Sequence, residues 1–362
     1  MTIFKPLAAD DRVSTKTLLH EAIPITGTIV SGTYGTFPND TNVQNFTHGM
    51  FQSVYDYPYL SSSANHIFDI SIGTSKDGLA TTSQTAKKDN IYNQMAQVLS
   101  GYDQDGVIQK FDEDGNITAG GNKIDNAVFL SFSRLLVKDE IKKGSFQLEL
   151  AASASYSTNI FGERIKITDY GAATSYKVNS PAGEYGILYV SNSAGTPLNG
   201  ITTPTQQPCG LLYYQAGVAV LNSAILMAGT GSGDGGFLSA SADFDGGGVT
   251  LTGSIIANEI SASADYFRHR IYNLQFNNTI ELNSTVYFCR AKHNEFNYSS
   301  NPTYLSGSQI RVKNQSTDIP ISYITSIGLY SADNQLLAVG KFSEPIRKDS
   351  NIELTFRARL DY

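Results

Sequence analysis

Near its C-terminus the chain reads Ile321-Ser-Tyr-Ile-Thr-Ser-Ile-Gly-Leu-Tyr330, and five residues later it continues Leu336-Leu-Ala-Val-Gly-Lys-Phe342. Both runs are rich in β-branched, aromatic and other apolar residues, and the segment between them, Ser331-Ala-Asp-Asn334, contains typical turn residues. Such a pattern predicts two strands joined by a hairpin. We therefore expect a fold that is mainly β.

Further strands are predicted on both sides of this pair. Thr285–Phe288 and Gln309–Lys313 precede it, and Ile352–Leu360 follows it with alternating apolar and polar residues. Five successive strands separated by turns are typical of an antiparallel sheet, and we expect antiparallel β-sandwich modules. We place this C-terminal antiparallel β module at residues 281–362.

A second β region, with little charge, precedes this module. Only five charged residues lie between positions 171 and 250. Strand-like runs occur at Gly186–Val190, Leu211–Leu221 and Val249–Ile256, and Phe146–Leu150 alternates as a strand. We place this low-charge domain at residues 146–280 and expect it to protrude from the rest of the chain.

The N-terminal region, residues 1–145, is predicted to be a small α+β scaffold. His66–Ile72 has the period of a strand, and two helices are predicted, at residues 84–100 and 124–143. The apolar stripe of the first is Ile91, Met95, Val98 and Leu99, and that of the second is Ile124, Val128, Phe129, Phe132, Leu135 and Leu136.

Composition excludes some classes of protein. The 362 residues carry a net charge of −7, and only 16% of them are charged. A general nucleic-acid binder needs a basic surplus to neutralise phosphates, so we expect no nucleic-acid partner. No apolar run has the length of a membrane span or of a secretory signal, so we expect no membrane partner either. Serine (38) and threonine (30) with low charge favour β-rich contact surfaces that suit assemblies.

Motifs for catalysis or cofactor binding are weak. Gly231-Ser-Gly-Asp-Gly-Gly236 fits a dinucleotide-binding spacing, but a helix is not predicted after it. The acidic run from Asp112 lacks the glycine and glutamate of a calcium loop, and the five histidines lie too far apart in sequence for a zinc motif. No pair of carboxylates is singled out for glycoside hydrolysis. We expect no enzyme activity and no catalytic, cofactor or metal site.

The C-terminal hairpin carries a resemblance to a known group. Ile324-Thr-Ser-Ile-Gly-Leu-Tyr330 with Leu336-Leu-Ala-Val-Gly-Lys341 resembles a strand pair of tailed-bacteriophage virion proteins, found in fibre-attachment modules and baseplate proteins. The segments 55–69, 91–96, 281–288, 295–302 and 355–362 look similar to structural proteins of contractile-tailed phages. The whole resemblance covers less than half of the chain.

This resemblance implies a structural component of a phage virion, a wedge-like tail baseplate or fibre-attachment subunit assembled in the host cytoplasm. Its implied partners are other virion proteins and further copies of the chain. Two alternatives stay open: a neck, collar or capsid-surface protein, and a glycan-binding receptor-recognition protein or depolymerase. The candidate interface residues are Tyr323, Ile327, Leu329, Tyr330, Leu336 and Leu337. In an alternating strand about half of them must face the core.

Overall fold

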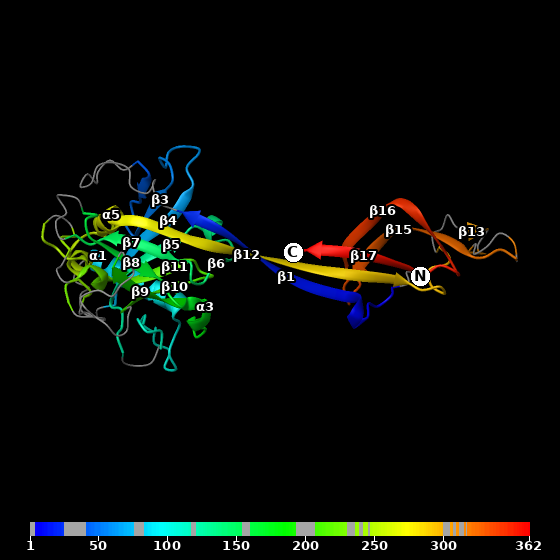
Figure 1. Cartoon of the computed structure of the whole chain (residues 1–362), viewed down its shortest axis with the longest axis horizontal. Helices are drawn as coiled ribbons and strands as arrows, with labels where there is room; N and C mark the ends of the chain where they lie inside the picture. The colour runs from blue at the N-terminus through cyan, green and yellow to red at the C-terminus, as the bar shows by residue number, and fades with distance from the viewer. Residues whose placement is uncertain are drawn as a thin grey trace. The chain divides into compact units, whose positions relative to one another are not determined.

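The structure is a computed structural model of the whole chain (Figure 1). It describes residues 4–24, 41–75, 83–116, 121–153, 160–192, 207–229, 236–238, 242–244, 247–299, 305–306, 309–310, 315 and 317–362. Two compact units divide the chain: unit 1 comprises Met1–Leu18 and Glu281–Tyr362, and unit 2 comprises Leu19–Ile280.

Unit 2 is built on strands of a large antiparallel sheet. Its strands are β2 (Val43–Asn45), β3 (Phe51–Tyr55), β4 (His66–Thr74), β5 (Asn126–Phe132), β6 (Glu140–Ile141), β7 (Gln147–Ala151), β8 (Arg164–Thr168), β9 (Tyr185–Asn192), β10 (Gln207–Tyr213) and β11 (Val218–Asn222). From β7 the strand order runs β7-β8-β9-β10-β11-β5-β4-β3-β2.

Two long strands belong to both units by residue number. β1 is Arg12–Pro24 and β12 is Ile271–Ala291, and the two are neighbours in the sheet. The remaining strands lie in unit 1 and are β13 (Leu305–Ser306), β14 (Gln309–Ile310), β15 (Ile321–Tyr330), β16 (Leu336–Asp349) and β17 (Leu354–Asp361). Among the described residues, the large sheet has 13 strands, and β13–β14 and β15–β16 form two-stranded hairpins. The fold is therefore mainly β, as the sequence predicts.

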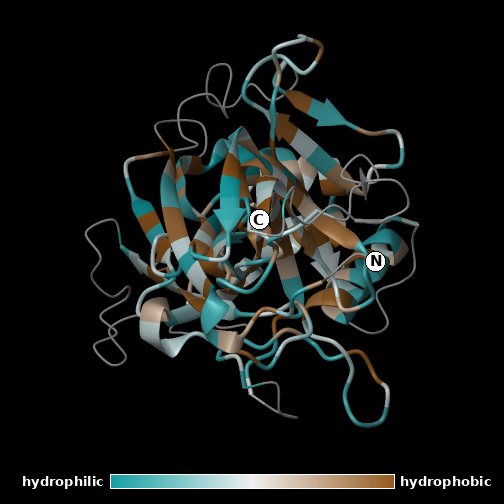
Figure 2. Ribbon diagram, turned by 90° about the vertical axis from the view of Figure 1, so that its right-hand side faces the viewer, coloured by the Kyte–Doolittle hydropathy of each residue, from teal (hydrophilic) through white to brown (hydrophobic). Residues whose placement is uncertain are grey.

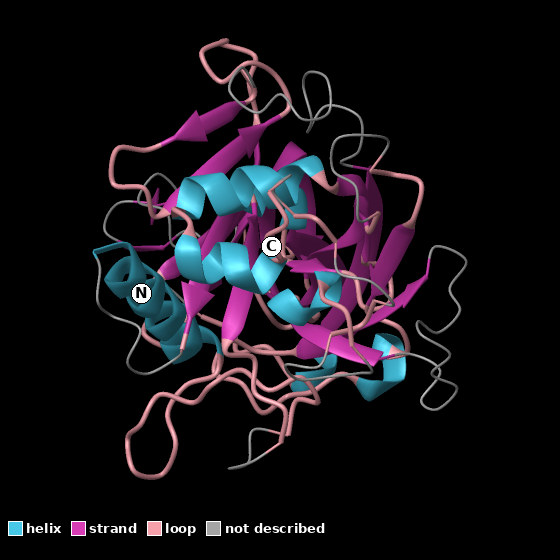
Figure 3. Cartoon of the chain, turned by 90° about the vertical axis from the view of Figure 1, so that its left-hand side faces the viewer, coloured by secondary structure: helices cyan, strands magenta, loops and turns pink. Residues whose placement is uncertain are grey.

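The helices are few and mostly short. They are η1 (Ala9–Asp11), α1 (Ser83–Leu99), α2 (Arg134–Val137), α3 (Ala172–Ser175), η2 (Ser223–Leu226), α4 (Leu251–Ala257) and α5 (Ile260–His269). In unit 2, helices lie over strands, with α1 packed on β4 and α5 packed on β3 and β4 (Figure 3).

The core of unit 2 is centred on β5 and β11. Every residue of β11 is buried, and in β5 only Ser131 is not. β5 pairs with β4 on one side and with β11 on the other, so both of its edges have a partner strand. A strand in such a position has a continuous apolar run instead of alternation, because both of its faces are covered.

The predicted helix at 84–100 is confirmed by α1, with one change to its face. Ile91 and Leu99 are buried and Met95 is partly buried, but Val98 is exposed. The buried face is centred on Tyr92, whose hydroxyl donates to the backbone oxygen of Ile124 at 2.6 Å. Gly101 ends the helix with a φ of +82°, a conformation that favours glycine.

The predicted helix at 124–143 is wrong. This segment forms β5, the single turn α2 and the two-residue strand β6. The spacing of Ile124, Val128, Phe129, Phe132, Leu135 and Leu136 fits a helical stripe. The segment also contains the continuous apolar run Ala127–Leu130, and such a short run does not distinguish a buried helix from a strand covered on both faces. The ladders to β4 and β11 decide for the strand, since they pair the backbone groups along its length.

The predicted strand at 249–256 is also wrong, because the segment contains helix α4. Leu251, Ser254 and Ile255 are buried at the i, i+3, i+4 spacing of a helical face. The Thr250 hydroxyl accepts from the Gly253 N–H at 3.2 Å and caps the start. At the other end, the buried Lys88 ammonium donates to the backbone oxygens of Ile255 (2.5 Å) and Asn258 (2.6 Å). Tertiary partners thus override the strand preference of the β-branched residues.

The other predicted strands have mixed outcomes. Those at 66–72, 146–150 and 186–190 are confirmed by β4, β7 and β9, and 211–221 contains β10 and β11 with a turn between them. The C-terminal runs are confirmed by β12, β15, β16 and β17. The predicted strand at 309–313 lies largely outside the described residues, where only Gln309–Ile310 forms a strand.

We expect Phe129→Ala to lower the free energy of unfolding by about 3–5 kcal/mol, because it removes a fully buried ring from the core. The Phe129 ring lies 5.7 Å from that of Phe111 and 6.3 Å from that of Tyr92. Chemical denaturation measures the loss. Leu135→Ala, at a side chain that is 61% exposed in the segment predicted as one helix, is the matched control and should change stability by less than about 0.5 kcal/mol. Equal losses would contradict the assignment of β5 to the core.

Unit 2 also contains a buried carboxylate, Asp169, which joins three parts of the chain. Its oxygens accept from the N–H groups of Gly144 (2.6 Å) and Phe146 (3.0 Å) and from the Tyr214 hydroxyl (3.1 Å). Burial raises the pKa of Asp169 to about 6, because desolvation outweighs these hydrogen bonds. The folded protein therefore binds this proton more tightly than the unfolded chain does.

Protonated Asp169 stabilises the folded state, because its pKa is higher in the folded protein than in the unfolded chain. This contribution to the free energy of unfolding is lost as the pH rises through about 6. Relative to Asp169→Asn, the wild type should lose about 2 kcal/mol of unfolding free energy between pH 4 and pH 7. Urea denaturation of both proteins across this range measures the difference. Parallel curves would contradict the raised pKa, and Asp105→Asn, in an exposed turn, is the control that should leave the curve unchanged.

Candidate interaction surface

The candidate site lies in unit 1 and begins with the ladder between β12 and β17. The two strands pair antiparallel, from Ser284 opposite Asp361 to Ala291 opposite Leu354. Apolar and polar residues alternate along β17, so Leu354, Phe356, Ala358 and Leu360 share one face of the strand. This face is half-buried throughout and nowhere fully buried. Figure 2 shows the alternation of hydrophobic and hydrophilic residues along strands of the chain.

The β15–β16 hairpin contributes a second layer. Tyr330 pairs with Leu336 at the turn of the hairpin. Asn334 in this turn has a φ of +61°, a left-handed conformation that asparagine tolerates. Farther along, Phe342 of β16 lies 4.8 Å, centroid to centroid, from Phe356 of β17. This ring contact connects the hairpin to the β12–β17 ladder.

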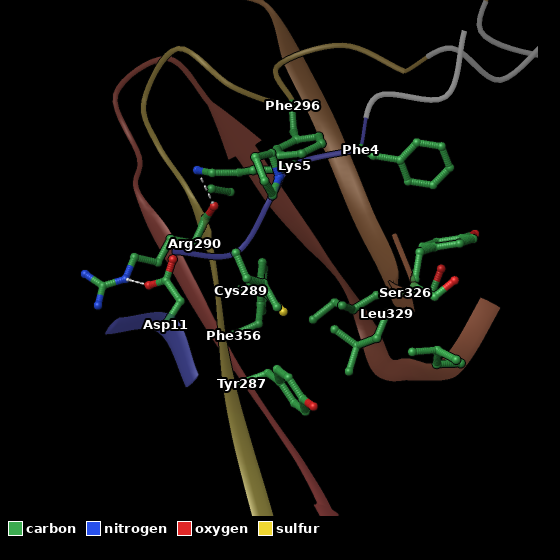
Figure 4. A pocket seen from close by; sticks show the side chains of 18 of the residues that line it. Phe4, Lys5, Asp11, Tyr287, Cys289, Arg290, Phe296, Ser326, Leu329 and Phe356 are labelled. Atoms are coloured by element: carbon green, nitrogen blue, oxygen red, sulfur yellow. Dashed lines mark hydrogen bonds and ion pairs between the residues drawn. The ribbon is translucent and has the colours of Figure 1, made fainter. Parts of the chain in front are cut away.

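A pocket of about 640 Å³ lies between these layers and the N-terminal segment. Tyr287 and Cys289 of β12 and Phe356 of β17 face Leu329 and Ser326 of β15 across it (Figure 4). Phe4 and Leu7 of the N-terminal segment also line it. The volume lies in the range of sites that hold a ligand or a partner's side chains, and most of the lining is apolar.

Ion pairs hold the N-terminal segment at the rim of the pocket. The Lys5 ammonium lies 2.5 Å from a carboxylate oxygen of Glu295 and donates to the backbone oxygen of Arg290 at 2.8 Å. The Arg290 guanidinium lies 2.7 Å from a carboxylate oxygen of Asp11. Surface ion pairs contribute little to stability, so we assign these a positioning role. The ring of Phe4 packs edge-on against Tyr330, with centroids 4.7 Å apart.

One residue of the lining has an unusual backbone. Phe296 has a φ of +55°, which is rare for a bulky residue and costs conformational energy. The Ser322 hydroxyl donates to its backbone oxygen, and the buried Lys348 ammonium donates to Asn297 Oδ1 at 2.7 Å. Lys348 also donates to the backbone oxygens of His293 and Asp349. These hydrogen bonds fix the loop that presents Phe296 to the pocket.

Unit 1 has almost no apolar core of its own. Among its described residues, Ala291 alone is both apolar and buried, and the other buried residues are polar. The apolar core clusters among the described residues consist of unit 2 side chains. Fourteen of the 27 large apolar side chains exposed in the described chain lie in unit 1, although it has 100 of the 362 residues.

The six predicted interface residues all lie on the β15–β16 hairpin. Tyr323, Tyr330, Leu336 and Leu337 are exposed, whereas Ile327 and Leu329 are half-buried. The pocket brings four of them together, Ile327, Leu329, Tyr330 and Leu337, and does not include Tyr323 or Leu336. Whether any of them touches a partner stays a prediction.

Sequence reasoning missed the pocket residues from outside the hairpin. The alternation of Leu354–Leu360 contained a signal for Phe356 and Leu360, because it marks one apolar face. Tyr287 and Cys289 likewise alternate along a strand. Phe4 had no such signal, since no pattern in the first residues predicts that they lie against the hairpin.

Chemistry other than contact has little support in the described part of the chain. No group of three or more His, Cys, Asp or Glu residues that could hold a metal ion occurs among the described residues. In the same residues, no helix has the length and hydropathy of a membrane span. No protein-family model, curated protein or solved structure matches the chain.

We expect Lys348→Ala to release the loop that carries Phe296, because it removes the donor to three oxygens of that region. The amide of Glu295, which donates to the Lys292 oxygen at 3.1 Å, should exchange with deuterium at least tenfold faster. Lys341→Ala, at an exposed lysine of the same strand, is the control and should leave this rate unchanged. An unchanged rate in Lys348→Ala would show that the loop is held by other contacts.

Proposed function

We propose that the chain is a structural component of a phage virion that acts through protein–protein interfaces, as a tail baseplate or fibre-attachment subunit. The observation that carries the proposal is the uncovered apolar surface of unit 1. Exposed apolar side chains gathered in one region of a soluble protein mark an interaction site. The resemblance of the same hairpin to strand pairs of tailed-phage virion proteins supports the virion as the place of this interaction.

In this proposal the two units have different tasks. Unit 2, with its buried core, provides a rigid body. Unit 1 provides the docking surface, through its pocket and through strands that have one partner strand each among the described residues. β17 has β12 as its described partner strand, and β15 has β16. A strand edge that remains open can accept a strand from another protein, which gives affinity through backbone hydrogen bonds.

We expect the chain to be present in purified particles of the source phage in fixed stoichiometry with the other tail proteins. Mass spectrometry of particles purified by density gradient measures this, and immunogold labelling locates the protein. Label at the tail end supports a baseplate or fibre-attachment position, and label at the head or collar assigns the neck, collar or capsid-surface alternative. Absence from intact particles would contradict the virion role.

A glycan-binding role is the second candidate, and one surface feature favours it. Tyr57 and Tyr59 are exposed on the loop that follows β3, next to Leu60. The Asp56 carboxylate fixes this loop by accepting from the backbone and side-chain nitrogens of Asn65, at 2.6 and 2.8 Å. Exposed tyrosines combine an apolar face with a polar group, which suits sugar rings. Binding to host polysaccharide that is lost in Tyr57→Ala would favour this candidate.

A further inference from the structure

Unit 1 lacks the apolar burial that its own folding requires. A domain of 100 residues normally buries well over half of the surface that its unfolded chain exposes. Ordering the backbone costs conformational entropy, which burial of apolar side chains must offset. In the described part of unit 1, Ala291 is the only apolar residue that is buried. The described part of this unit therefore leaves apolar surface that a partner could cover.

The uncovered surface is large enough for a stable interface. Fourteen large apolar side chains of unit 1 are exposed, among them Leu337 (67%) and Tyr323 (61%). Eight of them lie on β15 and β16 or line the pocket, namely Phe4, Leu7, Phe296, Tyr323, Tyr330, Leu336, Leu337 and Val339. With roughly half of a ~150–200 Å² side chain exposed at each, these eight offer on the order of 700 Å² per chain. A standard interface buries about 800 Å² per partner. The half-buried face of β17 and the open pocket add to this area.

Charge favours contact between copies of the chain through unit 1 over contact through unit 2. Unit 1 contains 12 of the 26 Lys and Arg residues and 10 of the 33 Asp and Glu residues, so its net charge is +2 and that of the other 262 residues is −9. Copies that approached through unit 2 would bring two strongly acidic surfaces together, whereas copies that approach through unit 1 would not.

The charges around the pocket also suit contact between identical surfaces. The rim carries both signs, with Lys5 and Arg290 beside Asp11 and Glu295. Two identical surfaces can be complementary only if each presents both partners of a charge pair. β15 adds a strand edge with neither charge nor proline, the residues with which natural edge strands prevent pairing.

We propose that a second copy of this chain covers the pocket and the β15–β17 strands of unit 1. Unit 1 reaches its folded form in this assembly, while unit 2 folds within a single chain. This inference rests on the proposed role of unit 1 as a docking surface and names its partner. Because the missing core is supplied between copies, the stability of unit 1 depends on protein concentration, whereas that of unit 2 does not.

The first test is the mass of the full chain in solution as a function of concentration. Sedimentation should give a multiple of 39.2 kDa for the wild type. The double variant Tyr323→Ser/Leu337→Ser should associate at least tenfold more weakly, because it removes two exposed apolar side chains of the hairpin. Leu60→Ser, at a unit 2 leucine that is 85% exposed, is the matched control and should associate as the wild type does.

The second test uses the two free cysteines as probes. Cys289 lines the pocket, and Cys209 is fully buried in unit 2. The rate at which a maleimide labels Cys289 should fall at least tenfold as the protein is concentrated through the association range, while Cys209 stays unlabelled. Hydrogen exchange of the β15 and β17 amides should slow over the same range, and that of β5 and β11 should be slow throughout.

Two outcomes would overturn the inference. A chain that stays monomeric at high concentration with slowly exchanging β15 and β17 amides would show that unit 1 folds alone. A monomer in which these amides exchange rapidly and those of β5 and β11 do not would show that the partner is a different protein. Neither result concerns the presence of the chain in virions. The proposed function is tested separately, by mass spectrometry of purified particles.

Discussion

Burial of apolar side chains around β5 and β11 is the interaction on which the rest of the described structure depends. These strands lie in the middle of the unit 2 strand order, between β4 and β10, with all or nearly all of their residues buried. The rings of Tyr92, Phe111 and Phe129 pack together there and connect helix α1 to the sheet. Lys88 and Asp169 enter this core with hydrogen-bond partners, as buried polar groups usually do.

The requirement for apolar burial also bears on unit 1. Its strands have the alternation of a half-buried sheet, but what they bury within the chain is largely polar. Exposed apolar surface of this kind marks interaction sites on soluble proteins. The proposed assembly role, the second-copy inference and the 640 Å³ pocket are three consequences of this single deficit. The strained Phe296 backbone lies at the pocket, where strain is often related to function. The Ser322 hydroxyl donates to the Phe296 backbone oxygen, and the Lys348 ammonium donates to the side chain of the next residue, Asn297.

Local pattern was sufficient where an element's own residues decide its structure. Helix α1 and strand β4 were predicted because amphipathic spacing and flanking turn residues agree with their environment. Pattern failed where partners from distant sequence decide. The segment 124–143 became β5 because β4 and β11 pair with it, and 249–256 became helix α4 because Thr250 and Lys88 cap it. Candidate interface residues were found only on the hairpin, and Phe4 joins them through a contact across more than 300 residues.

By itself, the sequence determined that the chain is mainly β, that an amphipathic helix follows the first strands, and that a hairpin lies near the C-terminus. These features depend on the residue types and their spacing, which act within a few residues of each other. Only the tertiary structure decided which apolar residues are covered. Burial depends on which distant strands become neighbours, and in the described part of unit 1 these neighbours leave the apolar face of β17 only half-buried and most of the large apolar side chains of the hairpin exposed.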